Sequence, residues 1–193
     1  TAPTVIPSTV PAASGTPAVS AKPSATPSAT PKVTLPPLKS DSILENYEDV
    51  FGYLGTCVNY GSNPSTSQLQ DEKTLAFVKK HFNSITMENE MKPDAVLGSK
   101  VTMITKEEAQ KLGYIIPDNY KETSVPKLNF DRIDKILQTA YDNGLGLRGH
   151  TLLWHSQTPG WFFAQNFDAD EDDVDTDTMN ARLDFYVCTV MNH

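Results

Sequence analysis

Two segments of the chain gather side chains that are suited to binding a polar ligand. The first is MENEMK, from Met87 to Lys92, and the second is RGHTLLWHSQTPGW, from Arg148 to Trp161. Their charged and amide groups can exchange hydrogen bonds with hydroxyl groups, and their tryptophans offer flat apolar faces. Together these groups suit a ring that carries many hydroxyls, such as a sugar.

Several of these side chains also have a purely structural explanation. Glu88 and Lys92 are four residues apart and could form a surface ion pair, although the proline that follows disfavours a helical pair. His150 follows an apolar run and, taken alone, is typical of a core histidine. The tryptophan, histidine and glutamine that come after it favour binding instead. Trp161 fits loop packing and a place near a ligand equally well.

The acidic run DADEDDVDTD, residues 168–177, superficially resembles a calcium-binding loop. Aspartates occupy its first, third and fifth positions, as in an EF-hand. The sixth position is Asp173, where an EF-hand has glycine, and the twelfth is Met179, where it has glutamate. A solvated loop is therefore favoured over a calcium site.

Three strand-and-helix units must position these segments. Strands are expected at residues 53–58, 84–87 and 145–154, because each is a short apolar run that leads into a polar loop. Strands that alternate with helices predict an α/β fold with parallel strands and right-handed crossovers. In such folds the working residues follow the C-terminal ends of the strands, and both polar segments lie there.

The expected helices are recognised by their apolar faces. The first would begin at a capping box formed by Ser67 and Gln70, and the second would close at Gly144. A long excursion at residues 93–127 contains one expected small helix, at residues 106–112. The three apolar faces consist, in turn, of Leu69, Leu75, Val78 and Phe82; of Ile133, Ile136, Leu137, Ala140 and Tyr141; and of Met179, Leu183, Tyr186, Val187, Val190 and Met191.

Two stretches resemble glycoside hydrolase family 10, the xylanases. FNSITMENEMKPD, residues 82–94, is similar to the second strand of that family, and LRGHTLLWHSQTPGWF, residues 147–162, to its third. The leading FGYLGTCVN, residues 51–59, also fits. The resemblance runs from about Ile43 to His193. It implies that residues 41–193 form the first three βα units of a (β/α)8 TIM barrel, and thus a partial barrel.

The resemblance implies sugar-binding roles at the ends of the second and third strands. Glu88 and Asn89 would hold hydroxyls of the xylose two units from the cleavage point, on the non-reducing side. Lys92, His150 and Trp154 would line the neighbouring subsite, where the reacting sugar sits.

Two more roles follow from the same resemblance. Gln157 would assist substrate binding, and His155 would support a carboxylate from behind. The excursion at residues 93–127 departs from the shorter pattern of the family. Because it lies beside the sugar site, it could alter substrate preference.

The same resemblance implies that the chain holds neither catalytic residue. A retaining glycosidase needs two carboxyl groups about 5 to 5.5 Å apart, and in this family they come from strands four and seven, beyond His193. Asn89 and Glu90 look like the Asn-Glu pair of the acid/base, but that pair ends the fourth strand within WDxxNE. Glu90 is therefore interpreted as a packing or ion-pair residue. No catalytic residue, metal or cofactor is expected.

The implied function is that of a retaining endo-1,4-β-xylanase, with xylan and xylo-oligosaccharides as its ligands. The chain of 193 residues is expected to be inactive by itself. A second polypeptide that carries the C-terminal half of the barrel could complete it. Two alternatives stay open, namely a non-catalytic carbohydrate-binding fragment and a related hydrolase of β-glucan.

Composition separates residues 1–40 from the rest. They hold nine of the fourteen prolines and no acidic residue, which predicts a Pro/Thr/Ser-rich linker of a secreted, extracellular protein. The net charge of -8 disfavours a nucleic-acid partner, and no apolar stretch is long enough to span a membrane. Cys57 and Cys188 lack the spacing of a zinc or redox site and are expected to be buried as small hydrophobic residues.

Overall fold

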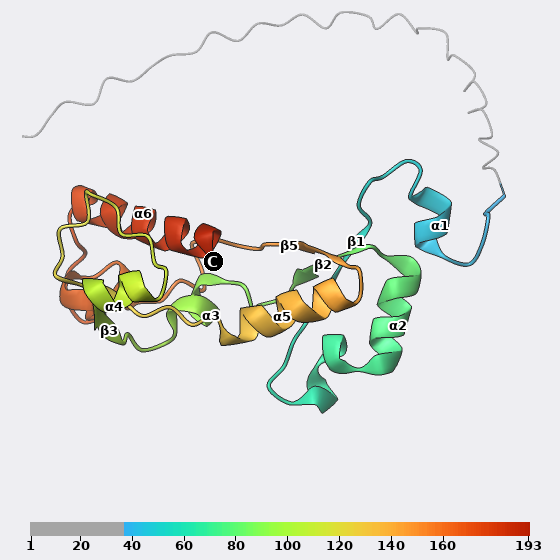
Figure 1. Ribbon diagram of the computed structural model, residues 1–193, viewed down its shortest axis with the longest axis horizontal. Helices are drawn as coiled ribbons and strands as arrows, with labels where there is room; N and C mark the ends of the chain where they lie inside the picture. The colour runs from blue at the N-terminus through green and yellow to red at the C-terminus, as the bar shows by residue number, and fades with distance from the viewer. Residues whose placement is uncertain (1–36) are drawn as a thin grey trace, which may run out of the picture. The chain divides into compact units, whose positions relative to one another are not determined.

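The computed structural model describes residues 37–193 (Figure 1). Residues 1–36, most of the predicted linker, lie outside the described residues. Within the compact unit of residues 38–193, a three-stranded sheet has the order β1-β2-β5. Its strands are Gly55–Val58 (β1), Ser84–Met87 (β2) and Gly146–Arg148 (β5), and both pairings are parallel. The predicted parallel arrangement is confirmed.

The third strand is shorter than the predicted residues 145–154. β5 ends at Arg148, which is paired with Thr86, one residue before the end of β2. Only Met87 of β2 lies beyond that pair, so β2 is too short to pair with a third strand that runs to residue 154. The apolar run continues past the strand, but pairing and not hydrophobicity sets where the strand ends.

The first two α-helices of the described chain are α1 (Ile43–Tyr47) and α2 (Glu72–His81). The predicted capping box at Ser67 and Gln70 is wrong. Residues 68–70 form a 3-10 turn, η2 (Gln68–Gln70), and Ser67 makes no side-chain cap. Asp71 caps α2 instead, since its carboxylate accepts hydrogen bonds from the amide and the hydroxyl of Thr74, both at 2.7 Å.

Helix α5 (Asp131–Asp142) packs with α2 against one face of the sheet. Ile136 and Ala140 are buried there beside Ile85 and Met87 of β2. The predicted apolar face of α5 is too wide, because Leu137 is 43% exposed and Tyr141 is 83% exposed. Only a narrow stripe of the helix meets the rest of the described chain.

The excursion at residues 93–127 is more ordered than predicted. The expected small helix is confirmed as α4 (Lys106–Lys111), which begins at a capping box of Thr105 and Glu108. Further elements were not predicted: helix α3 (Pro93–Leu97) and the antiparallel strands β3 (Met103–Thr105) and β4 (Ser124–Pro126). These strands have only three residues each, which is too short for a visible sequence pattern.

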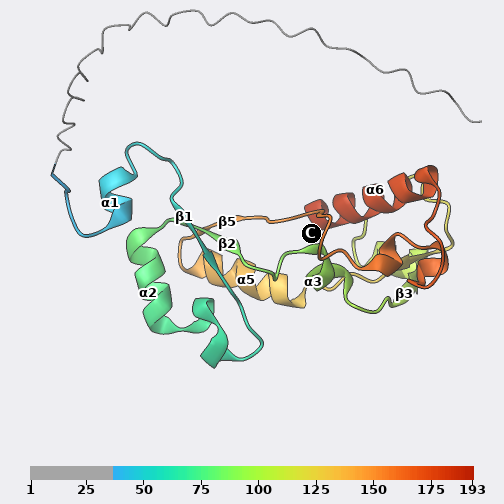
Figure 2. The same ribbon diagram turned by 180° about the vertical axis from the view of Figure 1, so that it is seen from behind.

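The last helix, α6 (Thr176–Asn192), lies alongside the excursion (Figures 1 and 2). Its predicted apolar face is only partly correct, because Tyr186 is buried but Met191 is 70% exposed. Phe185, which lay outside the predicted face, is fully buried against Tyr114 and Tyr120 of the excursion. Packing against the excursion thus buries a partly different face of α6 from the predicted one. Short 3-10 turns complete the fold: η1 (Pro64–Thr66), η3 (Gly160–Phe162) and η4 (Gln165–Phe167).

The prediction that both cysteines are buried is wrong, since Cys57 and Cys188 are both exposed. Cys57 is in register with Thr86 and Arg148, on the face of the sheet opposite the core residues Ile85 and Met87. Among residues 37–193, nothing long and apolar enough to cross a membrane occurs in a helix.

Candidate sugar-binding site

The two polar segments meet at the C-terminal edge of the parallel sheet. One follows β2 and the other follows β5, and parallel neighbours bring these ends together. A backbone hydrogen bond joins the segments, from the amide of Asp94 to the carbonyl of Gln157 at 2.9 Å. The loop after β5 is thereby attached to the first turn of α3.

Lys92 is the centre of the cluster that results. Its ammonium group donates to Oδ1 of Asn89 at 2.9 Å and to Oε1 of Gln157 at 2.8 Å. The same nitrogen lies 4.8 Å from the centre of the Trp154 ring, within the range of a cation–π interaction. Four residues that were predicted to bind sugar, Asn89, Lys92, Trp154 and Gln157, therefore come together.

Gln157 links the two segments through both ends of its amide. Its Nε2 donates to Oδ1 of Asn89 at 3.2 Å and, over a longer 3.4 Å, to Oδ2 of Asp94. Asp94 was not among the site residues predicted from the sequence. The available signal was its place two residues after Lys92, at the start of a helix.

Glu88, His150 and His155 lie around this cluster without hydrogen bonds to it among the described residues. Glu88 is exposed, and its amide donates to the carbonyl of Val58 at 2.9 Å. His155 is exposed, with its ring edge-on to Trp154 at 5.3 Å.

His150 is half-buried and lines a largely apolar cavity of about 420 Å³, together with Met91, Phe130, Ile133 and Tyr186. The peptide bond between His150 and Thr151 is cis. The residues that line the cavity place this imidazole against apolar side chains. The imidazole lies outside the hydrogen-bond network of Lys92.

Glu90 has a structural role. It is only 7% exposed, and its two carboxylate oxygens accept from the backbone amides of Tyr60, at 2.8 Å, and Asn89, at 3.0 Å. It forms no ion pair among residues 37–193. Glu90 thus ties the loop after β1 to the loop after β2, as a packing residue would.

Trp161, left open between loop packing and a place near a ligand, packs in the loop. Its side chain is 5% exposed and its indole N–H donates to the carbonyl of Gly98 at 3.1 Å. Arg148, by contrast, is exposed at the end of β5.

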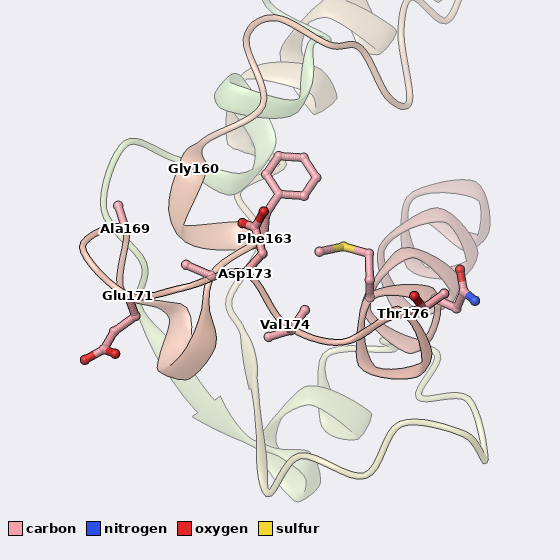
Figure 3. A pocket seen from close by; sticks show the side chains of 10 residues that line it. Gly160, Phe163, Ala169, Glu171, Asp173, Val174 and Thr176 are labelled. Atoms are coloured by element: carbon pink, nitrogen blue, oxygen red, sulfur yellow. The ribbon is translucent and has the colours of Figure 1, made fainter. Parts of the chain in front are cut away.

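The acidic run borders a second cavity, of about 470 Å³ (Figure 3). Phe163, Val174 and Thr176 are among its lining residues, and the carboxylate of Glu171 points away from it. In the part of the chain from residue 37 onward, no three His, Cys, Asp or Glu side chains are grouped as metal ligands. Asp175, within the run, caps α6 instead.

The chain is similar to known xylanases. The family model described as glycosyl hydrolase family 10 matches residues 42–193. The chain is 47% identical over 155 residues to endo-1,4-beta-xylanase A of Butyrivibrio fibrisolvens, with 80% of this chain and 36% of the relative covered. It is 36% identical over 121 residues to endo-1,4-beta-xylanase A of Thermotoga maritima, with 63% and 9% covered. It therefore spans about a third or less of the length of these relatives.

The chain is also similar to solved structures of xylanases. The CBM22-1 and GH10 modules of a Clostridium thermocellum endo-1,4-beta-D-xylanase, in complex with xylohexaose, align with a TM-score of 0.50 and 33% identity, covering 69% of this chain and 21% of that one. An intracellular xylanase variant of Thermoanaerobacterium saccharolyticum, in complex with xylotetraose, aligns with a TM-score of 0.54 and 26% identity, covering 80% and 38%.

These matches imply a (β/α)8 barrel. Residues 37–193 hold three of its parallel strands and no closed barrel. The polar cluster at the C-terminal ends of β2 and β5 lies where such barrels carry their working residues. The chain belongs to glycosyl hydrolase family 10.

Proposed function

We propose that the protein carrying this chain is an endo-1,4-β-xylanase that cleaves internal bonds of xylan with retention. The relatives that carry this name support the activity. The observation that carries the proposal for this chain is Lys92, held by Asn89 and Gln157 beside the ring of Trp154. An ammonium beside an aromatic face suits a sugar ring, because the ring has both hydroxyls and an apolar face.

Asn89 and Lys92 are proposed as hydroxyl ligands with spare donors. Oδ1 of Asn89 accepts from both Lys92 and Gln157, so its Nδ2 group stays free to donate among the described residues. Lys92 has three N–H donors and uses two of them on side chains. Exposed Glu88 next to Asn89 would add an acceptor for a hydroxyl hydrogen. His150 and Trp154 would line the side of the subsite where the reacting sugar sits.

The two catalytic carboxylates are proposed to lie outside residues 41–193. Retention needs a nucleophile and an acid/base about 5 to 5.5 Å apart. Near the cluster, Glu90 is occupied by two backbone amides and Asp94 faces Gln157. These contacts support roles other than catalysis for Glu90 and Asp94, and we propose that this chain supplies binding and needs the remainder of the barrel for cleavage.

The test is hydrolysis of xylan and of xylotetraose by the full-length protein, with the anomeric form of the first product read by NMR. The expected result is rapid release of short xylo-oligosaccharides in the β form. Changing Lys92 and His150 together to Ala should lower kcat/KM at least about 100-fold, as the loss of oriented polar contacts does. Unchanged activity in this variant would overturn the assignment of the site.

Two other outcomes would change the function itself. Tight binding of xylo-oligosaccharides without any cleavage by the full-length protein would make it a carbohydrate-binding protein. Faster cleavage of mixed-linkage β-glucan than of xylan would make it a related glucanase, and the excursion at residues 93–127 would then be the first place to look for the cause.

Two properties of the whole protein are part of the proposal. We propose that it is secreted, which the Pro/Thr/Ser-rich residues 1–40 support, and that a second polypeptide could supply the rest of the barrel. Activity found only inside the producing cells would contradict secretion. Intact mass under denaturing conditions decides the second point, because a single long chain would exclude a separate polypeptide.

A further inference from the structure

The backbone of Gln157 is held in an unusual conformation. Its φ is +54°, in the left-handed region that residues other than glycine seldom adopt. In this conformation the side chain is hydrogen-bonded to Asn89 and Lys92. The hydrogen bond from the amide of Asp94 to the carbonyl of Gln157 fixes the same residue from the other side.

The charges of Asp94 and Lys92 favour the same orientation of the Gln157 amide. An ionised carboxylate can only accept hydrogen bonds, and an ammonium group can only donate them. The amide lies between the two, so its Nε2 faces Asp94 and its Oε1 faces Lys92. With the amide reversed, an oxygen would face the carboxylate and an NH2 group would face the ammonium, and both contacts would be repulsive.

The orientation of this amide in turn fixes the cluster that contacts sugar. Oε1 of Gln157 holds the ammonium of Lys92 beside the Trp154 ring. Its Nε2 donates to Oδ1 of Asn89, and the Asn89 NH2 group makes no hydrogen bond among residues 37–193. Lys92, with three donors and two of them used on side chains, and Asn89, through its NH2 group, can then donate to the oxygen atoms of a ligand.

We propose that Asp94 is a positioning residue for the sugar subsite, which acts by orienting the Gln157 amide. This inference rests on the proposed function, because it assigns the cluster to a sugar. Asp94 is not expected to touch the substrate. Its effect should therefore require Gln157 and should disappear when Gln157 is absent.

A double-mutant cycle tests this dependence in the full-length protein. Asp94→Ala removes the carboxylate and keeps the backbone amide, so the link to the Gln157 carbonyl remains. We expect kcat/KM for xylotetraose to fall about five- to tenfold, the usual effect of one orienting hydrogen bond. In a Gln157→Ala background the same change should cost less than about twofold. Equal losses in both backgrounds would overturn the proposal.

Asp94→Asn is the graded variant in this series. Its carbonyl can accept from Nε2 of Gln157, but its NH2 group can equally donate to Oε1, so both amide orientations are allowed. Its activity should lie between that of the wild type and that of Asp94→Ala. An Asn variant as impaired as the Ala variant would contradict an orienting role. Glu107→Ala, a change at an exposed acid in α4, is the matched control and should keep full activity.

A second readout keeps the inference testable if xylan hydrolysis is absent. In protein labelled with ¹⁵N-glutamine, the Gln157 side-chain resonance is identified by its loss in Gln157→Ala. Asp94→Ala should shift that resonance and leave the other glutamine side chains in place, whereas Glu107→Ala should shift none. An unmoved Gln157 resonance would overturn the positioning role, whereas a shifted one with no cleavage of xylan would overturn the proposed function alone.

Discussion

The ammonium nitrogen of Lys92 lies 4.8 Å from the centre of the Trp154 ring, and its hydrogen bonds to side chains go to the neutral amides of Asn89 and Gln157. No carboxylate within the described residues forms a salt bridge with it. A cation held by neutral acceptors keeps its charge available for a ligand. This makes Lys92 the residue on which sugar binding should depend most.

Lys92→Met tests this expectation, because methionine retains much of the apolar stem and loses the donors. A hydrogen bond from a charged group contributes about 1.5 to 3 kcal/mol, so kcat/KM on xylotetraose should fall about 10- to 100-fold. Lys100→Met, at an exposed lysine after α3, serves as the control and should behave as the wild type. Similar kinetics for the two variants would exclude a direct role of Lys92.

Glu88 and Glu90 should respond in opposite ways to the same substitution. Glu90→Gln replaces one carboxylate oxygen by an NH2 group that faces a backbone amide, which should cost about 1 to 3 kcal/mol of the free energy of unfolding. Glu88→Gln changes an exposed side chain and should leave stability unaltered but weaken xylotetraose binding. Urea unfolding and steady-state kinetics on both variants give the comparison. A loss of kcat without a loss of stability in Glu90→Gln would contradict the packing role of Glu90.

The sequence could predict those elements whose limits are local. β2 was predicted with correct bounds, and α4 was placed within one residue, because an apolar run or a cap marks each of them. β5 was predicted six residues too long at its C-terminal end, since it ends at Arg148 and the prediction ran to residue 154. Its end depends on where its pairing with β2 stops. A local sequence pattern does not reveal such a pairing between distant segments.

For the candidate site, too, the sequence could predict some features and not others. Lys92 and Gln157 could be chosen because polar residues cluster after apolar runs and resemble a known family. The contact of Gln157 with Asp94 spans 63 residues, and that of Glu90 with Tyr60 spans 30. Both arise only when the parallel strands bring their loops together. A sequence read segment by segment shows the side chains but not these partners.

Arg182 should be the most sensitive position in α6 for stability. Its side chain is 1% exposed and bonds Glu122 twice, at 2.9 and 2.6 Å. It also donates to the carbonyls of Phe162 and Ala164, both at 2.8 Å, and lies 3.7 Å from the centre of the Phe167 ring. This one side chain connects α6 with the excursion and with the loop around η3 and η4.

Arg182→Met would leave Glu122 and two carbonyls without their partner. Breaking a buried ion pair on one side costs about 3 to 5 kcal/mol. We expect a loss of that size in urea unfolding of the full-length protein. Asp184→Ala, on the exposed side of the same helix, removes a hydrogen bond to Asn119 and should have a small effect. Equal effects of the two changes would show that the Arg182 network adds nothing to stability.

Asp175 gives α6 a stability that depends on pH. Its carboxylate accepts from the amide and the hydroxyl of Thr178 and from the amide of Asp177, and these hydrogen bonds hold its pKa below the ordinary 3.8. The stabilisation is therefore fully present above the pKa of the unfolded chain, near 3.8, and is lost as the pH falls through the lower folded pKa.

Asp175→Asn should destabilise the protein at neutral pH, because the uncharged amide is a weaker partner for the N-terminal amides of α6. The difference in unfolding free energy between wild type and variant should shrink as the pH is lowered below 3.8. Urea unfolding at several pH values measures it. Asp170→Asn, a change in the same acidic run at a side chain without a hydrogen bond among the described residues, should show no such convergence. A constant difference across the acid range would mean that the charge of Asp175 does not contribute to the cap.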